Sequence, residues 1–125
     1  MARILVIDDE SDTRAMLEQI LKSAGYEVIL AADGREGVQR YRTSPADLVI
    51  TDLYMPIQDG SETLRELRSC FPRIAIIAMS GRPDSGTTLP ISQVLPIVGI
   101  LPKPFLTDEL FAVVGKALGG QAQAQ

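Results

Sequence analysis

Five short runs rich in isoleucine and valine constrain the fold more than any other feature of the sequence. They cover residues 4–7, 28–31, 48–51, 74–79 and 98–101. Runs of this length and composition are typical of strands that are buried on both faces. Because segments with helical patterns separate them, we expect an α/β domain in which helices cover both faces of a parallel five-stranded sheet, joined by right-handed crossovers.

The segments between the runs carry signals for helix ends and for buried helix faces. The first has an apolar stripe that Gly25 ends, formed by Met16, Leu17, Ile20, Leu21 and Ala24. Asp33 and Glu36 are spaced as a capping box for a second helix. A third helix is expected to begin near Ser61, and a last one has Thr107 as its N-cap. The last helix is expected to bury Leu110, Val113, Val114 and Ala117.

The segment 84–95 favours a helix that is shorter than the segment itself. Pro90 would cost about 3 kcal/mol in a helix interior, whereas the first helical position tolerates proline. We therefore expect this helix to begin near Pro90 and to end by Leu95, since Pro96 disfavours helical geometry in the residue before it.

Length and composition indicate one domain and exclude several classes of protein. The chain has 125 residues, of which 46% are hydrophobic, so one compact domain over residues 1–120 is expected, followed by a flexible tail over 121–125. No apolar stretch approaches the length of a membrane span and no signal peptide pattern is present, which predicts a soluble, cytoplasmic protein. A net charge of -4 argues against a surface that binds nucleic acid. The absence of histidine excludes catalysis by histidine and metal sites with histidine ligands.

Polar residues follow four of the five predicted strands at the point where each strand ends. Asp8, Asp9 and Glu10 follow the first run, Asp52 the third, Ser80 the fourth and Lys103 the fifth. The carboxyl ends of parallel strands share one edge of a sheet, where ligands collect. If the first and third strands are neighbours, Asp8, Asp9 and Asp52 crowd one small volume. Carboxylates so close to one another would raise the pKa of at least one of them unless a cation lies among them. Mg²⁺ is the natural candidate for that cation.

Each of these residues also has a purely structural explanation. Asp9, Glu10 and Ser11 can cap the following helix, Asp52 and Ser80 can be turn or loop residues, and Lys103 can be a solvated charge. Four independent coincidences at four strand ends are less plausible than one site, so the conjunction favours a site.

The motifs at these strand ends resemble, in order and spacing, those of the receiver domains of bacterial two-component response regulators. The resemblance covers nearly the whole chain and rests on "ILVIDDE", "DLYMPIQDG", "MSG" and "KPF". It implies a doubly wound, flavodoxin-like sheet with strand order 2-1-3-4-5. It also implies that Asp52 is the phosphoryl acceptor, that Asp8, Asp9, Asp52 and the backbone carbonyl of Tyr54 hold Mg²⁺, that Ser80 is the switch hydroxyl and that Lys103 pairs with the carboxylate or phosphoryl group.

The resemblance also implies partners and a way of working. A sensor histidine kinase or a histidine phosphotransfer protein would supply the phosphoryl group, and an unidentified downstream protein would read the result, without direct binding to nucleic acid or membrane. The chain would be no enzyme beyond Mg²⁺-dependent self-phosphorylation and self-dephosphorylation at Asp52. Two alternatives are a degenerate receiver that only binds proteins and an aspartyl-phosphate phosphatase, although the latter usually carries a D-x-D pattern that "DDES" lacks.

The chain departs from the family pattern on the side that contacts partners, at Ile100 and also at Pro96-Ile97, where such domains often have a Gly-Ala pair. Receivers usually carry tyrosine or phenylalanine three residues before the lysine, where this chain has Ile100. We therefore expect phosphorylation to be read out by ordering of the loop after Ser80 rather than by an aromatic side chain.

Overall fold

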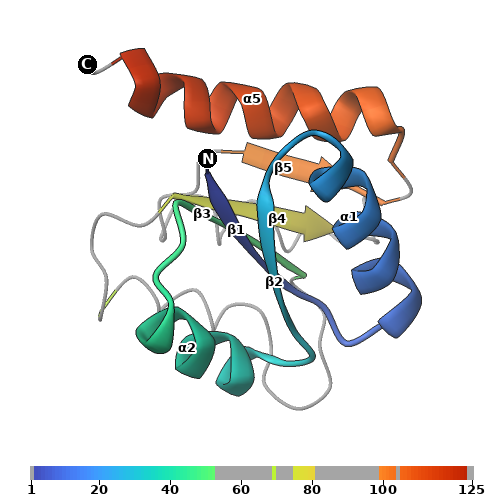
Figure 1. Cartoon of the computed structure of the whole chain (residues 1–125). Helices are drawn as coiled ribbons and strands as arrows, with labels where there is room; N and C mark the ends of the chain where they lie inside the picture. Colours follow the sequence, from blue (N-terminus) through green and yellow to red (C-terminus); the bar gives the residue numbers. More distant parts are fainter. Residues whose placement is uncertain (1, 53–68, 70–74, 81–98, 104, 124–125) are drawn as a thin grey trace.

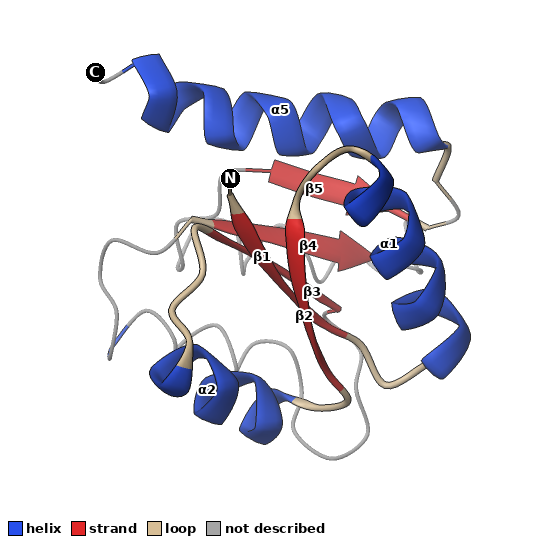
Figure 2. Cartoon of the chain, in the orientation of Figure 1, coloured by secondary structure: helices blue, strands red, loops and turns tan. Residues whose placement is uncertain are grey.

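The protein forms a single five-stranded parallel sheet with helices on both of its faces. The computed structural model describes residues 2–52, 69, 75–80, 99–103 and 105–123. Its elements are β1 (Arg3–Ile7), α1 (Ser11–Ser23), β2 (Glu27–Ala31), α2 (Gly34–Thr43), β3 (Leu48–Asp52), β4 (Ile76–Ser80), β5 (Gly99–Pro102) and α5 (Thr107–Gln123). The strand order is β2-β1-β3-β4-β5 (Figures 1 and 2). This confirms the predicted class, topology and strand order, with strand bounds that differ by one or two residues from those predicted.

Alternate residues of each strand pack on opposite faces of the sheet, so two apolar clusters form. In β1, Ile4 and Val6 belong to the cluster under α1 and α5, while Leu5 and Ile7 belong to the cluster under α2. The helices contribute Leu17, Leu21, Leu110 and Val114 to the first cluster, and Val38 and Tyr41 to the second. Figure 1 shows α2 on the side of the sheet opposite to α1 and α5. This two-faced burial explains why the strands read as continuous apolar runs rather than as alternating ones.

The first helix buries a narrower stripe than its sequence predicts. Leu17 and Leu21 are fully buried, but Met16 is 42% exposed and Ala24 is exposed as well. Gly25 follows the helix with a φ of 96°, a left-handed conformation that glycine adopts without steric cost. The predicted end of the helix is therefore confirmed, whereas the outer members of the stripe face solvent.

The second helix begins with the predicted cap. The side chain of Asp33 accepts a hydrogen bond from the backbone N–H of Glu36 at 2.9 Å. The side chain of Glu36 accepts in return from the N–H of Ala32 at 2.6 Å, one residue before the N-cap. Within this helix, a Cβ at Gly37 would overlap the side chain of Ile7, so α2 lies unusually close to β1.

The last helix begins one residue earlier than predicted, because Thr107 was expected to be its N-cap, and it runs further than expected. Thr107 is its first helical residue, and Glu109 accepts a hydrogen bond from the N–H of Leu106 at 2.7 Å. The helix reaches Gln123 and so enters the segment 121–125 that we predicted as a tail. The flexibility of that tail stays a prediction, because residues 124–125 lie outside the described residues.

Two further sequence predictions fall outside the part of the chain that the structure describes. These are the helix expected near Ser61 and the short helix expected within residues 84–95. None of the described helices is long and apolar enough to cross a membrane.

Candidate functional site

The register between β1 and β3 brings two acidic residues to the same place. Ile7 is paired with Thr51, so Asp8 and Asp52, each the next residue, lie side by side at the carboxyl edge of the sheet. Asp8 is completely buried and Asp52 nearly so. The convergence that the sequence predicted for these two carboxylates is confirmed.

The register between β4 and β5 brings the predicted lysine to the same edge. Ser80 is paired with Pro102, and Lys103 follows directly. Since β4 pairs with β3 through Met79 and Asp52, all four strand ends that carry polar residues meet at one edge.

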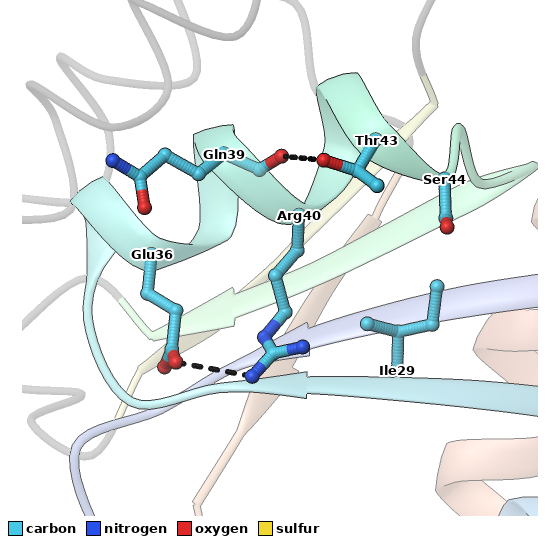
Figure 3. Close-up of a pocket in the computed structure, with 6 residues that line it drawn as sticks. All are labelled: Ile29, Glu36, Gln39, Arg40, Thr43 and Ser44. Atoms are coloured by element: carbon cyan, nitrogen blue, oxygen red, sulfur yellow. Dashed lines mark hydrogen bonds and ion pairs between the residues drawn. The ribbon is translucent and has the colours of Figure 1, made fainter.

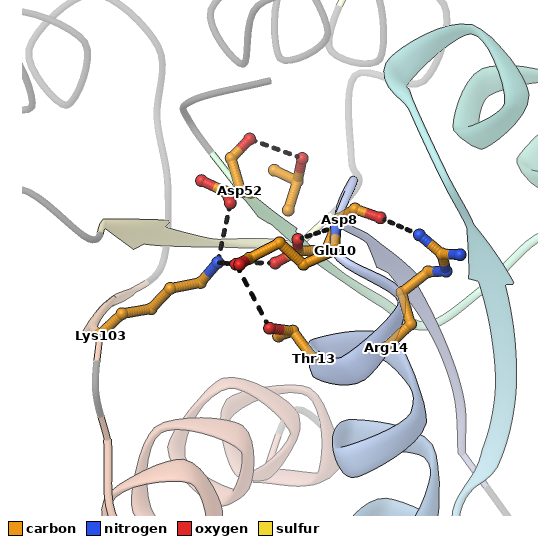
Figure 4. A network of polar contacts seen from close by, with 7 residues as sticks. Asp8, Glu10, Thr13, Arg14, Asp52 and Lys103 are labelled. Atoms are coloured by element: carbon orange, nitrogen blue, oxygen red, sulfur yellow. Dashed lines mark hydrogen bonds and ion pairs between the residues drawn. The ribbon is translucent and has the colours of Figure 1, made fainter. Parts of the chain in front are cut away.

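Lys103 is the centre of the charged network. Its Nζ donates to Oδ2 of Asp8 at 2.7 Å and to Oδ2 of Asp52 at 2.8 Å, and lies 3.5 Å from Oε1 of Glu10. Figure 4 shows the ammonium between these carboxylates, which come from β3 and from the segment between β1 and α1. The side chains of Asp8, Asp52 and Lys103 are 0%, 7% and 16% exposed, whereas that of Glu10 is 65% exposed. Three carboxylates thus face one ammonium in a site that is closed to water on its inner side.

The backbone and side chain of Asp8 are held by three different elements. Its Oδ1 accepts from the N–H of Glu10 at 2.8 Å, and its carbonyl accepts from Nη1 of Arg14 in α1 at 2.7 Å. Its own N–H donates to the carbonyl of Ala31 at the end of β2, at 3.1 Å. Asp8 therefore has a fixed position that orients one carboxylate oxygen toward Lys103.

Burial and pairing act in opposite directions on the charges of the site. Burial raises the pKa of Asp8 above its ordinary value, although the hydrogen bonds from Lys103 and from the N–H of Glu10 oppose this. Burial by itself would lower the pKa of Lys103, but the contacts with Asp52 and Asp8 prevail and raise it. Lys103 is consequently a permanent cation at neutral pH.

The carboxylates are arranged as ligands for a hard divalent cation. One oxygen each from Asp8, Glu10 and Asp52 lies within 4.8 Å of the others. Carboxylate oxygens are the ligands that Mg²⁺ prefers, and Mg²⁺ usually keeps some of its water. Because one ammonium faces three carboxylates, a divalent cation would also offset the excess negative charge. The donor set therefore fits Mg²⁺.

The predicted site residues have different outcomes. Asp8, Asp52 and Lys103 are brought together. Asp9 is exposed and lies outside the acidic cluster that the described residues form, so its metal role stays a prediction. Ser80 ends β4 at the same edge, and its role as a switch hydroxyl stays a prediction; Tyr54 lies outside the described residues.

Sequence reasoning missed Glu10 as a member of the site. The sequence placed Glu10 at the same strand end as Asp8 but did not predict it as a metal ligand, yet its carboxylate belongs to the acidic cluster. The available signal was its position two residues after Asp8 in a run of three acidic residues.

A hollow lies between α2 and β2, away from the charged site, with a volume of about 290 Å³. It is lined by Ile29, Glu36, Gln39, Arg40, Thr43 and Ser44 (Figure 3). Glu36 and Arg40, one turn apart on α2, form an ion pair at 3.2 Å in its lining. None of the predicted site residues lines this hollow, so it adds nothing to the charged site.

Comparisons with known proteins agree with the geometry. Residues 4–115 match the family model of the response regulator receiver domain. Response regulator MprA of Mycolicibacterium vanbaalenii is 38% identical over 110 residues, which cover 88% of this chain and 47% of that protein. The chain thus spans about half the length of this relative.

Two solved structures are similar over almost the whole chain. A response regulator receiver domain protein from Clostridium thermocellum is 29% identical, with a TM-score of 0.90 and full coverage of both chains. Response regulator protein TrrA from Thermotoga maritima, solved in complex with Mg²⁺ and BeF, is 33% identical, with a TM-score of 0.83 and coverage of 94% of this chain and 99% of that one.

Proposed function

Because the chain belongs to the family of response regulator receiver domains, we propose that it is a phospho-acceptor switch whose acceptor is Asp52. The donor would be a sensor histidine kinase or a histidine phosphotransfer protein. The observation that carries the proposal is the position of Lys103, whose ammonium bridges the buried carboxylates of Asp8 and Asp52. Receiver domains are signalling domains rather than catalysts of external reactions, and self-phosphorylation and self-dephosphorylation at Asp52 are the only chemistry proposed for this one.

The proposed reaction is attack by a carboxylate on a phosphoryl group. An oxygen of Asp52 forms a bond to phosphorus while the bond between phosphorus and the donor nitrogen breaks, and the donor histidine leaves with the bonding pair. In such transfers the barrier is lowered chiefly by in-line positioning and by positive charge near the phosphoryl oxygens. Lys103 supplies one such charge, since it already contacts Asp52 and remains protonated.

Mg²⁺ would supply further positive charge to the phosphoryl oxygens when bound. The residues proposed to hold it are Asp8 and Asp52, with Asp9 and the carbonyl of Tyr54 as the sequence predicts, and Glu10 at the outer side. The presence of Mg²⁺ in the TrrA complex supports this proposal. Asp8 is fixed by its contacts with Glu10 and Arg14, so it needs little reorganisation to bind a cation.

Phosphorylation would act as a switch because it changes the charge at Asp52. The phosphoryl group carries about -1.5 to -2 charges and three strong acceptors, in place of the single charge of the carboxylate. Lys103 would then pair with a phosphoryl oxygen, and Ser80 at the end of β4 would donate a hydrogen bond from its hydroxyl. The loop after Ser80 would change its population of states, and partner affinity would follow.

The test is direct phosphorylation of the purified chain. Incubation with acetyl phosphate and Mg²⁺ should add one phosphoryl group, detected by intact mass, and Asp52→Asn should abolish the gain. Asp12→Asn, which removes an exposed acidic residue of α1, is the matched control and should label normally. Labelling of Asp52→Asn at the wild-type level would refute the assignment, and a wild-type chain that never labels would favour a binding module that works without phosphate.

A further inference from the structure

Glu10 occupies a helix-capping position without capping the helix. It is the N-cap residue of α1, yet within the described part of the chain its side chain makes no capping hydrogen bond. N-cap positions favour asparagine, aspartate and serine, whose short side chains reach the free N–H groups of the first turn. The carboxylate of Glu10 instead lies 3.5 Å from Nζ of Lys103 and 3.4 Å from Oγ1 of Thr13 (Figure 4). The side chain thus serves the charged site rather than the end of the helix.

Glu10 is also the charge of the site that lies nearest to solvent. Exposure rises from the buried Asp8 and Asp52, through the mostly buried Lys103, to Glu10, whose side chain is 65% exposed. Its separation of 3.5 Å from Lys103 is that of an ion pair rather than of a tight hydrogen bond. Among the described residues of the site, the outermost charge is therefore negative.

From this geometry we infer that Glu10 determines phosphodonor specificity: its carboxylate disfavours small anionic donors in proportion to their negative charge. The inference rests on the proposed function, in which Asp52 is the acceptor. It assigns to the side chain of Glu10 a role that neither helix capping nor the positioning of Asp8 requires, since Glu10 contacts Asp8 through its backbone N–H.

Two small donors of different charge make the inference measurable. Acetyl phosphate is a dianion near neutral pH, and phosphoramidate is a monoanion. In each reaction an oxygen of Asp52 forms the new bond to phosphorus. Acetate leaves with the bonding pair as the P–O bond breaks, and ammonia leaves as the P–N bond of the N-protonated donor breaks. The chain acts on the same phosphoryl group in both, so the donors differ chiefly in charge and leaving group.

The size of the effect follows from the distance between the charges. The carboxylate oxygens of Glu10 and Asp52 lie within 4.8 Å of each other. In water with partial screening by salt, the repulsion between one negative charge and a dianion about 5 Å away lowers the rate roughly tenfold. The repulsion of a monoanion at the same distance lowers the rate roughly threefold. Removing the charge of Glu10 should therefore shift the ratio of the two rates by roughly threefold in favour of acetyl phosphate.

The experiment compares second-order phosphorylation rates for both donors in wild type, Glu10→Gln and Glu10→Asp, each at a Mg²⁺ concentration that saturates that variant. Glu18→Gln removes one charge further along the same helix, where Glu18 pairs with Lys22, and serves as the control. Only Glu10→Gln should change the ratio of the rate with acetyl phosphate to the rate with phosphoramidate. Its faster reaction with acetyl phosphate, relative to wild type, should become less marked as the salt concentration rises. Glu10→Asp, which retains the charge, should stay near wild type.

A structural role for Glu10 would give a different result. If Glu10 only helped to place Lys103 or to bind the metal, Glu10→Gln would change both rates by the same factor, and an unchanged donor ratio would overturn the inference while leaving Asp52 as the acceptor. Failure of the wild-type chain to accept phosphate from either donor would instead overturn the proposed function, and the inference with it. Thermal unfolding of each variant verifies that it is folded at the assay temperature.

Discussion

Replacement of Lys103 by methionine should destabilise the protein more than any exposed charge substitution. Methionine keeps most of the apolar stem but removes the ammonium that lies 2.7 and 2.8 Å from two buried carboxylates. Removing one partner of a buried ion pair typically destabilises a protein by about 3 to 5 kcal/mol, because the charge of the remaining partner is no longer compensated. Since the Lys103 side chain is not wholly buried, water can reach part of the site, and we expect the free energy of unfolding to fall by about 3 kcal/mol at neutral pH.

The same loss should shrink in acid and in the presence of Mg²⁺. Burial already raises the pKa of Asp8, and removal of Lys103 takes away a contact that lowers it. A carboxyl whose folded pKa is raised contributes stability that is fully present below its ordinary pKa of 3.8 and is lost as pH rises through the folded value. Lowering the pH from about 7 to about 5 should therefore recover part of the loss in Lys103→Met, and a bound divalent cation should replace the missing charge.

Urea unfolding followed by far-ultraviolet circular dichroism measures these differences. The matched control is Lys22→Met, since Lys22 forms an exposed ion pair with Glu18 at 3.0 Å and such pairs contribute at most about 0.5 kcal/mol. A cost in Lys103→Met no larger than in Lys22→Met would refute the reasoning. So would a cost that is the same at both pH values and insensitive to Mg²⁺, because the destabilisation would then come from lost packing rather than from uncompensated charge.

Two further substitutions test the metal site and the start of a helix. Asp9→Ala should weaken Mg²⁺ binding by about tenfold or more, as the loss of even an outer partner of a metal does; an unchanged affinity by isothermal titration calorimetry would leave Asp9 with a structural role only. Asp33→Ala should lower the free energy of unfolding by about 0.5 to 2 kcal/mol, because the N–H of Glu36 loses its acceptor, and a change below that range in urea unfolding would show that water replaces the cap without cost.

Most of the fold was predictable because strands that are buried on both faces appear in the sequence as uninterrupted apolar runs. A strand such as β1 alternates Ile4 and Val6 on one face with Leu5 and Ile7 on the other, and only a sheet covered on both sides explains four apolar residues in a row. The convergence of Asp8, Asp52 and Lys103 was predictable for a similar reason, since parallel strands end at one edge. The width of the buried stripe of α1 was less predictable, because Met16 has the right spacing for burial but is 42% exposed in the structure.

Which of Asp9 and Glu10 has its carboxylate next to Lys103 was not predictable from the residue types. Both follow Asp8 at the turn from β1 into α1, and both are acidic and exposed. Which of them reaches Lys103 depends on the backbone of that turn, where Glu10 has φ -89° and ψ 117° as an extended N-cap residue. One residue of shift at such a turn redirects a side chain from the site to solvent, and no property of the two residue types encodes that shift.

The dependence of the site on one cation links its resting stability to the proposed switch. Lys103 compensates Asp8 and Asp52 together, and Asp8 is held in place by contacts that do not involve Asp52. When Asp52 carries a phosphoryl group, Lys103 can exchange one oxygen partner for another while its contact with Asp8 persists. The exchange keeps the ammonium beside Asp8, whereas complete withdrawal of Lys103 would take away the ammonium that contacts both buried carboxylates. On this reasoning the phosphorylation step should need only a small movement of Lys103, and the readout stays the predicted ordering of the loop after Ser80.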